Sequence, residues 1–215
     1  MHTRPLLTAV LIGLVTTAGC TSTSAGDPSP APSTARTTAP GTAEPPAEEP
    51  PANLPAEGAP RVEHPLDTTR YQQDPCQALT GEQATEFAVV DQGTVREGEL
   101  GLICEWRSPR DELGKLSISS LDGNRDGLTA AYRAHQAGKY ELFEELPEIE
   151  GHPAVVYGQT NDRETGNCAV LVGTTDELAF EFAVQLSLAN VGSVDPCDMA
   201  VQVAGVALRN MKGDR

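Results

Sequence analysis

The chain has 215 residues, which allows one domain with extensions or two small domains. Its formal net charge of −16 at pH 7 comes from 31 acidic and 15 basic side chains. A field of that sign repels nucleic acid and anionic lipid surfaces, so both are poor partners and we expect no nucleic-acid partner. The chain has five cysteines. Because disulfides use cysteines in pairs, an exported protein with an odd number has one thiol that needs a separate explanation.

The first twenty residues predict export. A short basic start is followed by an apolar run from Leu6 to Val15, which is too short to span a bilayer and is typical of a signal-peptide core. Thr17–Cys20 then reads Thr-Ala-Gly-Cys, and this resembles the lipobox of bacterial lipoproteins, although Thr17 stands where Leu is usual. We therefore expect residues 1–19 to be a lipoprotein signal peptide and Cys20 to carry the lipid. The alternative is an ordinary secretory signal in which Cys20 has no role.

Residues 20–66 predict a lipid-anchored, disordered tether. They consist mainly of Pro, Ala, Thr, Ser, Gly and Glu, and 11 of the 17 prolines lie here. Such a segment buries too little apolar surface to offset the entropy of ordering it. The folded, extracytoplasmic domain is then expected at residues 67–215.

Helix signals occur at both ends of this domain. Asp74-Pro75-Cys76 and Asp195-Pro196-Cys197 each place a capping Asp before a Pro that fits the first helical position. Thr80–Gln83 fits a capping box, and the apolar residues between Leu128 and His135 recur at helical spacing, with Gly138 able to end that helix.

Strand signals lie between these helices. Apolar and polar residues alternate over 102–107, 116–121 and 178–189, and short apolar runs cover 153–158 and 168–173. The alternation puts Cys104 and Trp106 on one buried face. Residues 141–150 are strongly acidic around Pro147 and predict an exposed connection.

These elements predict an α+β domain with a mainly antiparallel sheet of about five strands and helices packed on one face. Four cysteines without a Cys-x-x-Cys pair favour two disulfides over zinc. If the first and last helices lie side by side, Cys76 pairs with Cys197, and the two strand residues Cys104 and Cys168 form the other bridge. Four cysteines allow three pairings, so this one is a hypothesis.

The lipobox, the Pro-rich tether and several short motifs occur in a familiar order. The motifs are Asp-Pro-Cys-x-x-Leu-Thr at 74–80, Cys-x-Trp at 104–106, Gly-x-Pro-Ala at 151–154, the strand residue Cys168 and the closing Asp-Pro-Cys helix. Together they resemble an actinobacterial envelope lipoprotein family, domain of unknown function 3558, over roughly residues 74–212. The resemblance implies an extracytoplasmic, lipid-anchored domain with disulfides, and it implies no catalytic residues.

Candidate sites are few. Asp122–Gly127 matches the first half of a calcium loop, but Arg133 stands where the bidentate Glu is needed, so a Gly-rich turn with Asp126 as helix cap is the favoured interpretation. His135 and His152 belong to no recognisable catalytic arrangement. The glutamates of residues 141–150 could form a glycosidase pair, although a solvated acidic loop is favoured.

We expect a non-enzymatic surface lipoprotein with no cofactor, no metal site and no catalytic residues, anchored to the outer face of the cytoplasmic membrane through Cys20. Its partner would be an envelope protein or a small ligand. The alternatives are a carrier that holds an apolar molecule between sheet and helices, an envelope hydrolase, and a structural accessory protein.

Overall fold

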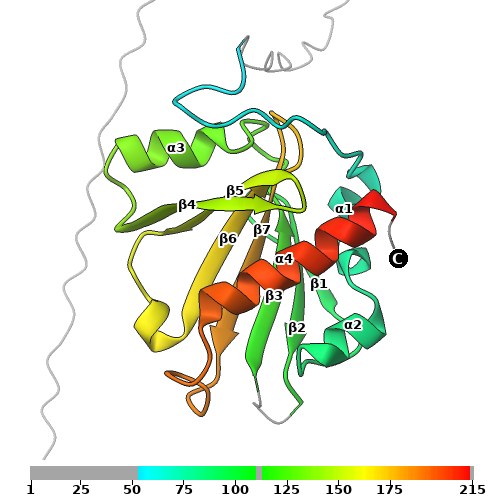
Figure 1. Ribbon diagram of the computed structural model, residues 1–215. Coiled ribbons are helices and arrows are strands. Elements are labelled where there is room, and N and C mark those ends of the chain that lie inside the picture. The colour runs from blue at the N-terminus through cyan, green and yellow to red at the C-terminus, as the bar shows by residue number, and fades with distance from the viewer. Residues whose placement is uncertain (1–52, 110–112, 214–215) are drawn as a thin grey trace, which may run out of the picture. The chain divides into compact units, whose positions relative to one another are not determined.

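The computed structural model describes residues 53–109 and 113–213 (Figure 1). A single antiparallel sheet has the strand order β1-β2-β3-β7-β6-β5-β4. The strands are β1 (Thr94–Glu97), β2 (Leu102–Arg107), β3 (Gly114–Ser120), β4 (Leu142–Ile149), β5 (His152–Gly158), β6 (Asn167–Gly173) and β7 (Ala179–Leu186). The helices are α1 (Thr69–Gln73), α2 (Gly81–Glu86), α3 (Thr129–Gln136) and α4 (Pro196–Lys212), with 3-10 turns at Pro75–Ala78 and Arg163–Thr165. The α+β class is confirmed, but the sheet has seven strands and not five.

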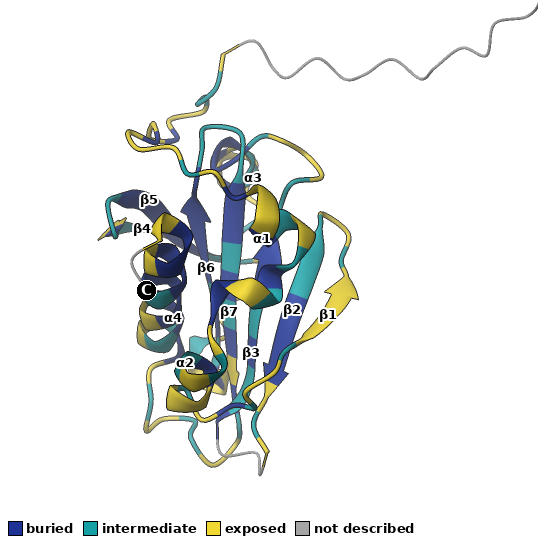
Figure 2. Cartoon of the chain, turned by 90° about the vertical axis from the view of Figure 1, so that its right-hand side faces the viewer, coloured by how far each residue is buried: buried dark blue, intermediate teal, exposed yellow. Residues whose placement is uncertain are grey.

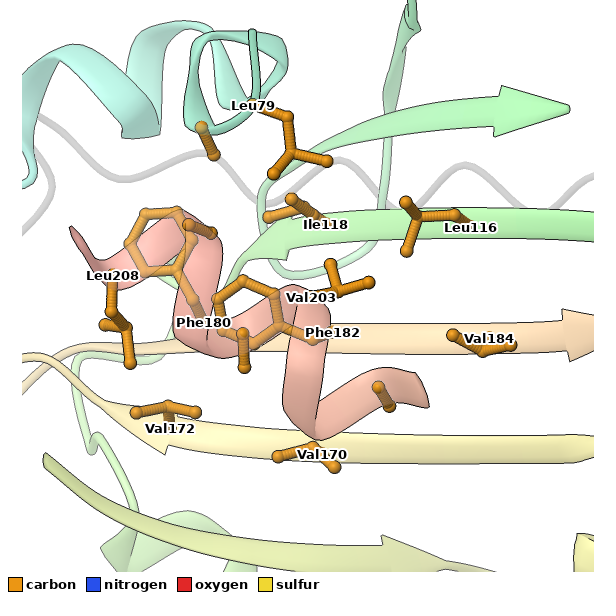
Figure 3. Packing of buried hydrophobic residues seen from close by; sticks show 14 of the residues in the cluster. Leu79, Leu116, Ile118, Val170, Val172, Phe180, Phe182, Val184, Val203 and Leu208 are labelled. Carbon is orange, nitrogen blue, oxygen red and sulfur yellow. The ribbon is translucent and has the colours of Figure 1, made fainter. Parts of the chain in front are cut away.

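The main core lies between the sheet and α4 (Figure 3). Because alternate strand residues point to opposite faces, β7 turns Phe180, Phe182 and Val184 toward the helix. Val203 and Leu208 of α4 lie over them, and all five side chains are at most 2% exposed. The predicted alternation is confirmed as far as residue 186, where the strand ends.

The two additional strands form the edges of the sheet. The acidic segment 141–150, expected to be an exposed connection, is mostly strand β4, because Leu142 and Ile149 are buried while the strand pairs with β5. The pairing shifts register between Leu146 and Ile149, where Pro147 lacks an N–H to donate. Solvent-facing glutamates and a Pro protect such an edge from further strand pairing. At the other edge, all four residues of β1 are exposed, so its sequence carries no burial pattern (Figure 2).

The predicted caps at Asp74, Thr80 and Asp195 are confirmed. The Asp74 carboxylate accepts from the Cys76 N–H, although the turn that follows is a 3-10 helix. The Asp195 carboxylate accepts from two N–H groups at the start of α4, and Thr80 and Gln83 form the reciprocal capping box of α2.

The four cysteines form two disulfides, but the predicted pairing is wrong: Cys76 bonds to Cys104 and Cys168 bonds to Cys197. The first helical segments, residues 69–86, do lie beside α4, because the side-chain amide of Asn210 donates to the Ala78 carbonyl at 2.8 Å. They meet the C-terminal part of α4, however, about 20 Å along the helix axis from Cys197. Cys76 therefore reaches β2, and Cys197 reaches β6.

The folded part begins before residue 67. Residues 53–66, here called the strap, were expected to be disordered, yet Ala59 and Val62 are buried. The Val62 N–H donates to the Asp176 carboxylate at 2.9 Å, and the Leu66 N–H donates to the Thr174 carbonyl at 2.9 Å. The last part of the expected tether therefore packs on the turn before β7.

The helices do not all cover one face. Leu128, Ala131 and Tyr132 of the α3 region pack with Val155 of β5 and Leu171 of β6. These strand residues point away from α4, because their neighbours Val156 and Val170 belong to the core beneath α4. The helix α3 thus covers part of the second face. Across residues 53–109 and 113–213, no helix has the length and hydropathy needed to cross a membrane.

Candidate functional site

Part of the second sheet face, opposite α4, is not covered by α3, and we call this part the open face. Three small residues on neighbouring strands stand in one row across it: Ser117 of β3, Ala183 of β7 and Ala169 of β6. The row continues to Tyr157 of β5 on one side and to Glu105 of β2 on the other. Since adjacent strands are ~4.8 Å apart, this row of small side chains is flanked by large ones ~19 Å apart.

The small residues form the floor of a cavity of about 280 Å³, here called the hollow. Its walls carry an ammonium, three amides, a hydroxyl and a carboxylate beside Tyr157. These polar groups belong to Lys115, Gln159, Asn167, Gln185, Thr160 and Asp162. A concave site with a partly apolar lining and a few convergent polar groups is the usual form of a small-ligand site.

The phenol of Tyr157 is held at one end of the hollow. Its hydroxyl donates a short hydrogen bond to the Glu181 carboxylate, and the Tyr140 ring packs edge-on at 5.3 Å between centroids. Burial, reinforced by the negative charge of Glu181, raises the pKa of Tyr157 far above its ordinary value. Tyr157 is therefore a protonated donor and an apolar ring, and does not act as a base.

Cations gather at the other end. The Glu105 side chain is only 5% exposed, and Arg96 and Arg107 each contact a different one of its oxygens at 2.6 Å. The Lys115 ammonium lies 3.6 Å from the same carboxylate and also lines the hollow. Three cations around one carboxylate leave a local excess of positive charge on a chain whose net charge is −16.

A second concavity lies between α2, α4 and β4. This groove of about 710 Å³ has apolar side chains such as Phe87, Leu146 and Met199, with Glu86 and Glu148 along it. It adjoins the core beneath α4, and among its polar side chains Arg209 and Glu150 are already paired with each other.

The sequence singles out the cysteines and the Asp122–Gly127 loop as candidate sites. Cys20 lies outside the described residues, and the other four cysteines are bonded to one another. In the Asp122–Gly127 loop the Asp126 carboxylate binds Arg133 at 2.7 Å and does not cap α3, whose N-cap Leu128 has no side-chain cap. Over the described ranges, no group of three or more His, Cys, Asp or Glu side chains could hold a metal ion.

The two histidines singled out from the sequence have packing roles. The His135 ring stacks on Phe143 with centroids 4.2 Å apart. His152 is fully buried, and its Nδ1 lies 3.2 Å from the Gly173 carbonyl, while no partner among the described residues reaches Nε2. Burial lowers the pKa of His152, so its ring is neutral at neutral pH.

A glycosidase pair is the less favoured interpretation of residues 141–150, and the adjacent Glu144 and Glu145 of β4 do not form one. Glu144 binds Arg163 at 2.6 Å, while Glu145 accepts from the Tyr132 hydroxyl at 3.0 Å on the second face. Strand neighbours point to opposite faces, so these two carboxylates do not face a common substrate.

The family model "Protein of unknown function (DUF3558)" matches residues 15–210. The chain belongs to the DUF3558 family. No curated protein and no solved structure shows a match to it. Membership in DUF3558 therefore supplies no chemistry, and the open face has to be interpreted from its own residues.

Sequence reasoning missed the hollow of this DUF3558 chain. The available signal is the run of small or polar residues on the outward positions of β3, β6 and β7, including Ser117, Ala169 and Ala183. It becomes a site only when the strand order brings the three residues into one row.

Proposed function

We propose that this chain is an envelope lipoprotein, anchored through a lipid on Cys20 to the outer face of the cytoplasmic membrane. Its domain would be a non-enzymatic binding module, and its ligand would occupy the hollow. The signal-peptide pattern, the Cys that follows it and the Pro-rich segment support the anchoring. Two disulfides fit an oxidising compartment outside the cytoplasm.

The observation that carries the binding role is the hollow itself. The helix α4 covers one face of the sheet and α3 covers part of the other, and on the remainder small residues keep the row at Ser117, Ala183 and Ala169 recessed while polar side chains converge around it. A sheet face selected only for solubility has no reason to combine a recessed floor with a held tyrosine and a cation cluster.

The packing favours this role over a carrier of an apolar molecule between sheet and helices. That space is filled by side chains such as Trp106, Phe182 and Leu208, each at most 1% exposed. A hydrolase is less well supported than a binding module, because the Tyr157 hydroxyl is already committed to Glu181 and is held protonated.

Native mass spectrometry tests the binding role. The full chain is isolated from its own membranes, and the wild type is expected to carry a reproducible bound mass. Ala183→Trp fills the floor of the hollow, and Gln185→Trp covers its exposed rim, so both should lose that mass while Ala183→Ser keeps it. A wild-type chain without a bound mass, or Trp variants that retain it, would contradict binding in the hollow.

Metabolic labelling with palmitate tests the anchor. The wild type should incorporate label, and Cys20→Ala should not. Equal incorporation into both chains would refute lipidation at Cys20 without touching the binding role.

A further inference from the structure

The chemistry of the hollow narrows the class of ligand, and this step rests on the proposed function. Its first element is the ammonium of Lys115. Both oxygens of Glu105 are already contacted at 2.6 Å by arginines, so Lys115 at 3.6 Å is the most weakly held of the three cations. Its side chain is 31% exposed and belongs to the wall of the hollow. Lys115 is therefore placed to bind an anionic group of a ligand.

Neutral hydrogen-bonding groups adjoin this cation. Lys115 pairs with Gln185, and Gln185 pairs with Asn167, so an ammonium and two amides stand in one row beside the small floor residues. Amide side chains both donate and accept, as hydroxyl groups do. A ligand that carries several hydroxyls would match this row.

The far end of the hollow has the opposite polarity. Asp162, whose carboxylate accepts from the Thr160 hydroxyl at 2.6 Å, lines the cavity in the connection between β5, the strand of Tyr157, and β6. A carboxylate accepts hydrogen bonds from hydroxyls and repels an anion, while the ring offers apolar surface to C–H groups. The ligand would therefore lie with its anion at Lys115 and its hydroxyl-bearing ring toward Tyr157.

We propose that the hollow binds an acidic saccharide, with its carboxylate at Lys115, its hydroxyls on the amides of Gln185 and Asn167, and a sugar ring against Tyr157. Each contact uses a group that already lines the cavity. The carboxylate distinguishes this ligand from a neutral sugar, and the hydroxyls distinguish it from a simple inorganic anion.

Calorimetry on the full chain, purified in a polyoxyethylene detergent without sugar groups, tests the proposal. The probes are trigalacturonate, the neutral galactotriose and inorganic phosphate. Trigalacturonate should bind saturably and at least tenfold more tightly than either of the others. Lys115→Gln should lose this preference, whereas Lys139→Gln removes an exposed cation that does not line the hollow and should keep it.

A gain of affinity gives a second readout. Glu105→Gln keeps the shape of the side chain but frees the three cations from their carboxylate, so trigalacturonate should bind severalfold more tightly at low salt. The gain should shrink as salt is added, because exposed charges are screened. A protein that failed to fold would instead lose binding.

The outcomes separate this inference from the binding role itself. Equal binding of the acidic and neutral trisaccharides, or preference for phosphate, would overturn the acidic saccharide. In another outcome, the chain binds none of the three probes while it still carries a bound mass that Ala183→Trp loses. That result would also overturn the acidic saccharide, but it would be consistent with the binding role of the hollow. Unchanged trigalacturonate binding in Lys115→Gln would refute the role of that ammonium.

Discussion

Asn210 connects α4 to the N-terminal part of the domain, and its replacement is the sharpest test of this architecture. The side chain is 2% exposed, and its Nδ2 donates to the Ala78 carbonyl at 2.8 Å and to the Gln83 Oε1 at 2.7 Å. The Asn210 backbone carbonyl accepts from the hydroxyl of buried Tyr71 at 2.8 Å. One residue of the last helix thus holds the first helices against the core.

The cost of Asn210→Ala follows from what each partner can do next. Ala78 is fully buried, so its carbonyl loses a donor that water does not replace, which costs about 1–3 kcal/mol. Gln83 is only half-buried and can bind water, so its loss is about 1 kcal/mol. The free energy of unfolding should therefore fall by about 2–4 kcal/mol.

Urea unfolding with both disulfides intact, followed by the fluorescence of buried Trp106, measures this change. Asn161→Ala is the matched control, because Asn161 is exposed in the connection after β5, and its change should stay within ~0.5 kcal/mol. A loss below ~0.5 kcal/mol for Asn210→Ala would show that the link between α4 and the N-terminal turns does not stabilise the fold.

Three further outcomes are expected. Because the pKa of His152 is lowered in the folded chain, the unfolded chain binds more protons in acid, so the free energy of unfolding should fall as the pH drops below about 6.5. In unfolding titrations between pH 7.5 and 5, His152→Asn should reduce the dependence of this free energy on pH. An unchanged pH dependence would assign it to other groups. Replacing Cys168 and Cys197 together by Ala should cost about 3–4 kcal/mol by loop closure over a separation of 29 residues, and unfolding curves that coincide with the wild type would refute the pairing. Asp176→Ala removes the acceptor for the Val62 N–H, so amide exchange in the strap should accelerate while exchange in β7 stays the same; equal protection in both chains would show that the strap does not depend on this contact.

Features set by local sequence could be predicted. The period-two pattern around Phe180 and Phe182 identified the central strand, and Asp195 with Pro196 identified the first residues of α4. In both cases the physical cause lies within one element: alternating burial in the strand and an unsatisfied N–H at the helix start.

Features that depend on tertiary position could not be predicted from the sequence. The acidic composition of residues 141–150 predicted a loop because the buried positions of β4 are few, and the strand is stabilised by pairing with β5 instead. The disulfide prediction correctly placed the first and last helices side by side but could not tell which end of α4 the first turns contact. Since α4 is long, the choice of end decides whether Cys197 reaches Cys76 or Cys168.

The hollow depends on strand register, and the same residues that would bind its ligand also oppose a wrong register. A slip of one residue between β2, β3 and β7 would exchange the two faces, so that Glu105 and Lys115 would enter the core and Trp106 would leave it. The native register exposes the small residue Ser117 at little cost, whereas the shifted register would bury unpaired charges at a far higher cost. The charged residues thus keep the open face outward, and they keep its row of small residues accessible to a ligand.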